Sequence, residues 1–168
     1  MKLENIDKTT YRKHLNRVIA GSAIAFAALA IGLAQATIFL FTDREGSHFA
    51  INLSGVIVAM IIVGTFLNKI KHHPYMYEVY YVWRLKQQIN YITRKLKAVE
   101  TAADQNDPKA IHTLYFYYKA CRQLYLLDDN TIIMDELSVK SAALDSKIDD
   151  LNLTLDASDY QQAWLDAF

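Results

Sequence analysis

Two long apolar stretches constrain the fold of this chain more than any other feature of its sequence. Residues 18–41 and 49–67 contain no charged side chain. A helix rises about 1.5 Å per residue, so the stretches extend roughly 36 Å and roughly 28 Å, against a bilayer hydrocarbon core of about 30 Å. Only residues 42–48 connect them. This spacing predicts a transmembrane helical hairpin, residues 18–68, with spans at about 18–41 and 49–68.

The first stretch also has two features of a signal peptide. Basic residues precede it, and Ala34-Gln35-Ala36 imitates a cleavage site. However, the stretch is 24 residues long and stays apolar beyond that triplet. An uncleaved anchor is therefore favoured, and even after cleavage the second span would deliver the C-terminal part to the same side.

Lysine and arginine flank the pair of spans at both ends. Five precede the first span, and four follow the second within about twenty residues. The connecting loop contains only Arg44. Cationic flanks of membrane spans remain in the cytosol. Both termini, including the basic segment 1–17, are therefore predicted to be cytosolic.

Residues 69–168 are predicted to form a cytosolic helical domain. Asp107 followed by Pro108 is a helix-start signal, and residues 128–130 form a second polar break. We expect helices at about 75–103, 108–127, 131–155 and 159–167, and no strand. Apolar residues recur in the first of them at alternating spacings of three and four, which is typical of a packed helix. This seam consists of Val82, Leu85, Ile89, Ile92, Leu96, Val99 and Ala103.

Two arrangements of these helices are open. Short connections favour an antiparallel helical bundle, which would make the chain an all-α membrane protein with a two-helix transmembrane hairpin and a cytosolic bundle. Alternatively, the seam at 82–103 forms a homodimeric coiled coil. Charge favours internal pairing, because residues 69–127 contain ten Lys and Arg against four Asp and Glu, and residues 128–168 contain two against ten.

Aromatic and basic residues gather around the ends of the spans. Tyrosine and tryptophan prefer the bilayer interface, and basic residues there attract anionic lipid headgroups. This composition predicts membrane lipid as a partner, although the same aromatic residues are also suited to the core of the bundle. The predicted membrane-interface residues are Arg17, Lys69, Lys71, Tyr75, Tyr77 and Trp83.

Small residues recur inside the spans, where they allow helices to approach closely. On the first span they form a strip at spacings of three and four. Either the second span of the same chain covers this strip, or a second copy does and the protein is a homodimer; we predict the homodimer. The predicted packing residues are Gly21, Ala25, Ala28, Gly32, Gly55 and Ala59.

No pattern of residues in the chain is typical of an enzyme. The single cysteine, Cys121, falls on a helix seam, where it is expected to be buried rather than reactive. His72-His73 lacks the spacing of a metal site, and the basic helix residues lack a nucleic-acid-binding motif. The sequence therefore predicts no catalytic, cofactor-binding or metal-binding residue, no cofactor, no nucleic-acid partner, and identifies no small-molecule substrate.

Several aromatic and basic segments resemble a known family of small bacterial membrane proteins, filed as domain of unknown function 3087. The resemblance covers nearly the whole chain and implies a location in the bacterial inner membrane. It carries no activity, ligand or site residue. The segments are Tyr11-Arg12-Lys13-His14-Leu15-Asn16-Arg17, His73-Pro74-Tyr75-Met76-Tyr77-Glu78-Val79-Tyr80-Tyr81-Val82-Trp83, Phe116-Tyr117-Tyr118, and Gln123-Leu124-Tyr125-Leu126-Leu127-Asp128-Asp129-Asn130.

These features favour a membrane-anchored, non-enzymatic adaptor or scaffold, whose cytosolic helices bind another protein or a second copy. The alternative is an accessory subunit of a larger membrane transporter or membrane enzyme, acting through the transmembrane hairpin. The identity of the protein partner is not encoded in any motif.

Overall fold

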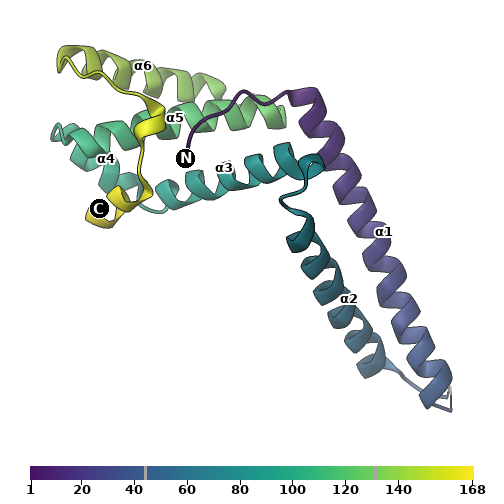
Figure 1. Cartoon of the computed structure of the whole chain (residues 1–168). Coiled ribbons are helices and arrows are strands. Elements are labelled where there is room, and N and C mark those ends of the chain that lie inside the picture. Colours follow the sequence, from purple (N-terminus) through teal and green to yellow (C-terminus); the bar gives the residue numbers. More distant parts are fainter. Residues whose placement is uncertain (44, 131) are drawn as a thin grey trace. The chain divides into compact units, whose positions relative to one another are not determined.

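The computed structural model of the chain describes residues 1–43, 45–130 and 132–168, which are helical and contain no strand (Figure 1). Arg44 of the connecting loop and Thr131, the expected first residue of the third helix, lie outside the described residues. The elements are α1 (Lys8–Phe41), α2 (Phe49–Ile70), η1 (Pro74–Met76), α3 (Tyr77–Thr93), α4 (Leu96–Asp104), α5 (Pro108–Asp128), α6 (Met134–Asp150), η2 (Ala157–Asp159) and η3 (Gln162–Ala167).

The chain divides into two compact units. Thr9–Tyr80 form one, here called the span unit, and Met1–Lys8 together with Tyr81–Phe168 form the other, the core unit. The division expected from the sequence lay at residues 17 and 69. The observed division differs from this expectation because the first eight residues pack with the helices that follow the spans. No pattern in the local sequence indicates this contact.

The span unit contains the two predicted spans. Helices α1 and α2 are both long and apolar enough to cross a membrane. They contact each other through small side chains, because Ala30 and Ala34 of α1 are buried, as are Gly55 and Ala59 of α2. A Cβ atom at Gly55 would lie 2.9 Å from the Ala30 carbonyl oxygen and 3.1 Å from the Ala34 Cβ. The missing side chain at Gly55 therefore permits the close approach of the two helices.

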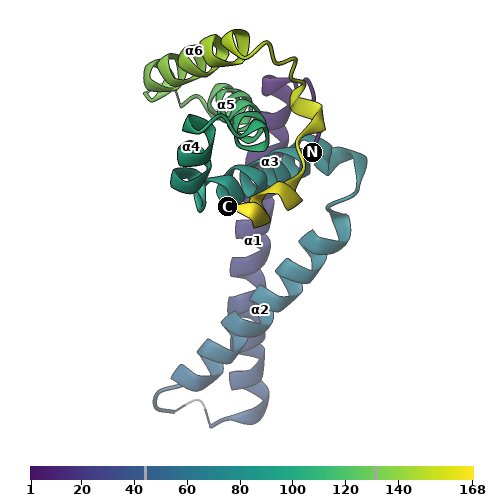
Figure 2. The same cartoon turned by 90° about the vertical axis from the view of Figure 1, so that its left-hand side faces the viewer.

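Helix α5 occupies the centre of the core unit. It packs against both α4 and α6 (Figures 1 and 2). The predicted seam supplies much of the remaining core, since Leu85, Ile92 and Val99 are each 0% exposed within one chain. These side chains are already covered from within, so the seam is not open to a second copy. The structure thus favours packing of residues 82–103 within their own chain over the alternative of a coiled-coil homodimer.

The helix expected at 75–103 is two helices. Helix α3 ends at Thr93, and the Lys95 backbone (φ −116°, ψ 9°) is not helical, so α4 begins at Leu96. The Thr93 hydroxyl donates to the Ile89 carbonyl at 2.8 Å, a side-chain bond that bends helices. The bend keeps Ile92 and Val99 in one core on either side of the turn.

Local signals set the ends of α5 and α6. The Asp107 carboxylate accepts from the Ala110 N–H at 2.9 Å, and Pro108 follows it, which confirms the predicted helix start. Helix α5 ends at Asp128, at the predicted break. Helix α6 ends at Asp150 rather than at 155, because Asn152 takes a left-handed conformation (φ 52°) that stops a helix.

The tail after α6 folds back onto the core unit. Tyr160 is buried and stacks on Phe116 with ring centroids 4.3 Å apart. The His112 Nε2 donates to the Asp156 carbonyl at 2.6 Å, and Lys95 Nζ donates to the Leu165 carbonyl at 2.7 Å. The helix expected at 159–167 is instead the short 3-10 segments η2 and η3, because tertiary anchors set the path of so short a segment.

The first eight residues join the core unit through a closed set of hydrogen bonds. The Tyr81 hydroxyl accepts from the Glu4 N–H at 2.9 Å and donates to Gln123 Oε1 at 3.0 Å. The Gln123 amide donates to the Glu4 carbonyl at 2.5 Å. An ion pair between Lys8 and Asp129 completes the attachment. The segment before the first span is thus part of the fold that follows the second span.

Candidate functional site

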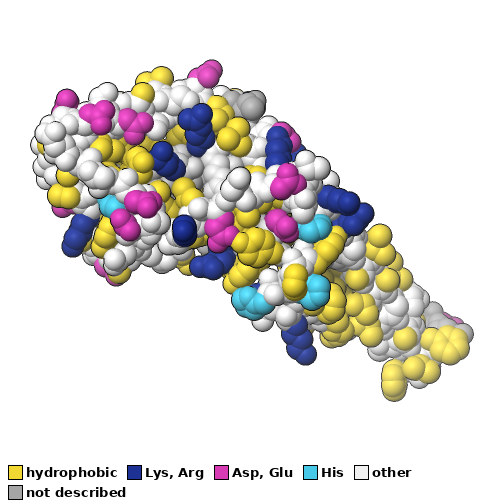
Figure 3. All heavy atoms as spheres, turned by 45° about the horizontal axis from the view of Figure 1, so that its top comes forward, with side chains coloured by type: hydrophobic (Ala, Val, Ile, Leu, Met, Phe, Trp, Pro, Cys, Tyr) yellow, Lys and Arg dark blue, Asp and Glu magenta, His cyan; other side chains and the backbone are white. Residues whose placement is uncertain are grey.

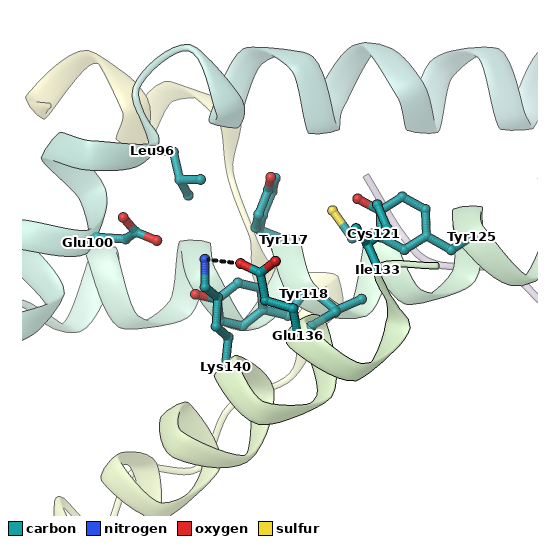
Figure 4. Close-up of a pocket in the computed structure, with 10 residues that line it drawn as sticks. Leu96, Glu100, Tyr117, Tyr118, Cys121, Tyr125, Ile133, Glu136 and Lys140 are labelled. Atoms are coloured by element: carbon teal, nitrogen blue, oxygen red, sulfur yellow. Dashed lines mark ion pairs between the residues drawn. The ribbon is translucent and has the colours of Figure 1, made fainter. Parts of the chain in front are cut away.

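A cavity of about 140 Å³ lies between α4, α5 and α6 (Figure 4). Helix α5 packs against both neighbours, and the cavity occupies the space that the three helices leave between them. It is called here the tyrosine cavity, after the α5 residues that line it: Tyr117, Tyr118, Cys121 and Tyr125. Cys121 follows Tyr117 by four residues and Tyr118 by three, and Tyr125 follows Cys121 by four, so the four side chains share one side of the helix.

Polar groups with no net charge line the α5 side of the cavity. Burial is the main cause that raises the pKa of the Cys121 thiol to about 11, although hydrogen bonds with Tyr117 and Tyr125 lower it. Burial likewise raises the pKa of Tyr117 to about 12, and its hydroxyl lies 3.3 Å from the Thr93 hydroxyl. These groups stay protonated at neutral pH, so Cys121 is not placed to act as a nucleophile.

The remaining lining combines apolar and charged side chains. Leu96 of α4 and Leu137 of α6 supply apolar surface together with Ile133. Glu136 and Lys140 form an ion pair of 3.1 Å on α6, and Figure 4 shows Glu100 on α4 turned toward the same region. The hydrogen bond that Lys140 donates to Glu136 is the main cause that raises the pKa of Lys140.

The predicted membrane-interface residues take two different environments. Arg17, Lys69, Tyr77 and Trp83 are exposed. Lys71 is half-buried and donates to Asn68 Oδ1 at 2.8 Å. Figure 3 shows that the visible surface over α1 and α2 is mainly hydrophobic, whereas charged side chains gather over the rest of the chain.

Other aromatic residues of that cluster serve packing. Tyr75 is half-buried and its ring packs against the His14 ring at a tilt of 35°, with centroids 4.1 Å apart. His14 Nδ1 lies within hydrogen-bond distance of Glu78 Oε2, at 2.9 Å. Tyr81 is buried in the core unit. The members of the cluster are therefore divided between exposed positions and positions in the packed interior.

The predicted strip of small residues on α1 is not where α2 packs. Gly21, Ala25, Ala28 and Gly32 are exposed, and a Cβ atom at Gly21 or Gly32 would meet nothing within 4 Å. Of the predicted packing residues, only Gly55 and Ala59 lie in the contact. Two residues along a helix turn by about 200°, so Ala30 and Ala34 face away from the predicted strip. The expectation that the second span covers this strip is wrong.

One feature of the sequence does indicate the tyrosine cavity. The packed side of α5 has tyrosine or cysteine at 117, 118, 121 and 125, where leucine is usual. The polar tips of such side chains need polar surroundings. No group of three His, Cys, Asp or Glu side chains within residues 1–43, 45–130 and 132–168 is placed to hold a metal ion.

Comparison with known proteins yields one match. The model of the family described as "Protein of unknown function (DUF3087)" matches residues 1–165. No curated protein and no solved structure matches the chain.

Proposed function

The chain belongs to the DUF3087 family, and on that premise we propose that it is a membrane-anchored, non-enzymatic adaptor in a bacterial inner membrane. In this proposal α1 and α2 form a transmembrane hairpin, and the core unit is a cytosolic helical bundle that binds another protein.

The exposure of the two apolar helices supports the membrane anchor. In each of α1 and α2, only 11% of a strongly apolar stretch of 18 residues is buried within the chain. Side chains such as Ile24, Ile31 and Phe66 are largely exposed. Leaving so much apolar surface in water costs about 25 cal/mol per Å², and lipid removes that cost. Lipid headgroups would contact the exposed interface residues Arg17, Lys69, Tyr77 and Trp83.

The observation that carries the proposal is which segments of the chain make up the core unit. Met1–Lys8 precede both spans and Tyr81–Phe168 follow them, yet they form one compact unit. Two parts of one unit must lie on the same side of a membrane, so the chain between them crosses it an even number of times. The cationic flanks assign that side to the cytosol.

Reporter fusions test this topology. Alkaline phosphatase, which is active only outside the cytosol, is expected to be active when fused at Gly46 and inactive when fused after Phe168, because the loop alone lies outside. The protein is expressed in a bacterial host at low level, and a cytosol-active reporter at the same two sites is the control. Phosphatase activity only at the C-terminal fusion contradicts the proposal.

Exposed apolar side chains outside the spans support binding of a protein partner. The most exposed of the aliphatic ones lie around the α5–α6 connection, where Ile132 is 91% exposed, Val139 71% and Leu126 51%. Large exposed apolar groups of this kind are frequent at protein–protein contacts. This stretch is the surface that we assign to the adaptor's partner.

The uncovered strip of α1 favours a second candidate function. Since α2 packs on the opposite side, Gly21 and Gly32 are free to contact another span. An accessory subunit of a membrane transporter or membrane enzyme would use this strip to bind a multi-span partner.

Co-purification of the full chain in mild detergent separates the two functions. For the adaptor, a soluble partner is retained by the natural chain and lost from a variant with Ile132→Asp and Val139→Asp, because charge opposes apolar docking. For the accessory subunit, a multi-span partner is retained by that variant and lost with Gly32→Leu. Retention of every partner by both variants would contradict both functions.

A further inference from the structure

We propose that the tyrosine cavity of the core unit is a binding site for a small organic monocation, with a benzene-sized apolar body and one ammonium group. The cavity is lined by α4, α5, α6 and Ile133, the residue directly before α6, all within the core unit. The inference therefore does not rest on the proposed adaptor function or on the membrane topology.

The size of the cavity limits the body of the ligand. Its volume is about 140 Å³, and an apolar protein cavity of about 150 Å³ accommodates benzene. Leu96, Ile133 and Leu137 provide apolar walls for such a ring.

The charge of the cavity selects a cation. Glu100 and Glu136 contribute two carboxylates, and Lys140 contributes one ammonium group. At neutral pH the lining therefore has a net charge of −1, which one monocation neutralises. An anion would instead meet two like charges, and a neutral ligand would leave the excess carboxylate charge unpaired.

The protein already shows how an ammonium group is held at this position. Lys140 Nζ lies 3.1 Å from Glu136 Oε1, and Glu100 and Tyr118 also favour its charged form. The side chains of Lys140 and Glu136 are 48% and 67% exposed, so this ion pair is in contact with solvent and Lys140 is free to swing outward. A ligand ammonium group would then bind the carboxylates of Glu136 and Glu100. Lys140 competes with the ligand for these carboxylates.

The tyrosines suit the apolar body of the ligand, because their rings are apolar. The Tyr117 hydroxyl stays neutral because burial raises its pKa to about 12. The Cys121 thiol is neutral for the same reason. The apolar body therefore meets rings and protonated groups inside, while its ammonium group meets the carboxylates.

Three probes of equal size test the proposal: benzylammonium, neutral benzyl alcohol and anionic benzoate. The full chain in detergent, carrying a ¹³C label on isoleucine methyl groups, is titrated while the Ile133 methyl signal is recorded. This signal reports on the cavity itself, so partition of a probe into the micelle does not mimic binding. We expect benzylammonium to bind with a dissociation constant of about 1 mM, as ligands of this size do, and about tenfold more tightly than benzyl alcohol. Benzoate should not bind.

Two variants with opposite expected effects make the test specific. Glu136→Gln should weaken benzylammonium binding about tenfold because it removes a charged acceptor, whereas Lys140→Gln should tighten it about threefold because it removes the competing cation. Asp145→Asn is the matched control, since Asp145 is an exposed α6 carboxylate outside the cavity lining; its affinity should be unchanged. Far-ultraviolet circular dichroism verifies that each variant is folded.

The proposal is overturned if no saturable shift of the Ile133 methyl signal occurs. It is equally overturned if benzyl alcohol binds as tightly as benzylammonium, or if Glu136→Gln and Lys140→Gln change the affinity in the same direction. A loss of folding in Glu136→Gln would leave the decision with Lys140→Gln and the three probes.

Discussion

Leu85→Asp is expected to unfold the core unit. Leu85 is 0% exposed in the seam of α3, so the substitution removes a buried apolar side chain and places a carboxylate where no water reaches it. The combined loss is about 4 kcal/mol or more, a large part of the 5–15 kcal/mol that stabilises a typical domain. Thermal unfolding of the full chain in detergent, followed by circular dichroism, measures the effect.

Leu126→Asp is the matched control for this substitution. It makes the same chemical change on α5, where the leucine side chain is 51% exposed, and the aspartate remains hydrated. The midpoint of unfolding should change little, by an amount equivalent to less than about 0.5 kcal/mol. Equal effects of the two substitutions would show that the seam is not the core of this unit.

Gly55→Leu is expected to separate α1 from α2. A Cβ atom at Gly55 would lie 2.9 Å from a backbone carbonyl oxygen of α1, and the backbone cannot yield as a side-chain tip does. Overpacking of this kind costs about 1–3 kcal/mol. Spin labels at Ile24 on α1 and Phe66 on α2, both exposed positions, should report a longer and broader distance distribution in the variant.

Gly64→Leu is the control for α2, because a Cβ atom there meets nothing within 4 Å. It should leave the distance distribution unchanged. If Gly55→Leu also leaves it unchanged, the two helices do not pack through this glycine.

Gly32→Leu separates contact within a chain from contact between chains. A Cβ atom at Gly32 also meets nothing within 4 Å of its own chain, so a change in behaviour must come from a second molecule. In the predicted homodimer, Gly32→Leu lowers the yield of cross-linked dimer in native membranes and Ser22→Ala does not. A purely monomeric band at near-native expression, unaffected by Gly32→Leu, would contradict the homodimer.

The local chemistry of the sequence determined the helical elements of this protein. Uncharged stretches of sufficient length predict α1 and α2 as candidate spans, and the Asp107-Pro108 pair predicts the start of α5. The seam from Val82 to Ala103 predicts which side chains are buried, and Leu85, Ile92 and Val99 confirm it. Each of these features depends on a few neighbouring residues, which is why spacing and composition suffice.

Only the tertiary structure decided which surfaces meet. The strip of small residues on α1 is a good packing surface by composition, yet Ala30 and Ala34 on the opposite side match Gly55 and Ala59. Composition favoured the strip with Gly21, Ala25, Ala28 and Gly32, whereas complementarity with α2 selected the opposite face.

The same holds for contacts between distant segments. Glu4 meets Tyr81 and Gln123, and the tail meets Phe116 and His112, although nothing in the spacing of these residues pairs them. The tyrosine cavity exists because α4 and α6 both pack on α5. Local propensity acts within a turn of helix, whereas these contacts depend on the direction in which each helix leaves its turn, and that direction is set by the packing of the whole unit.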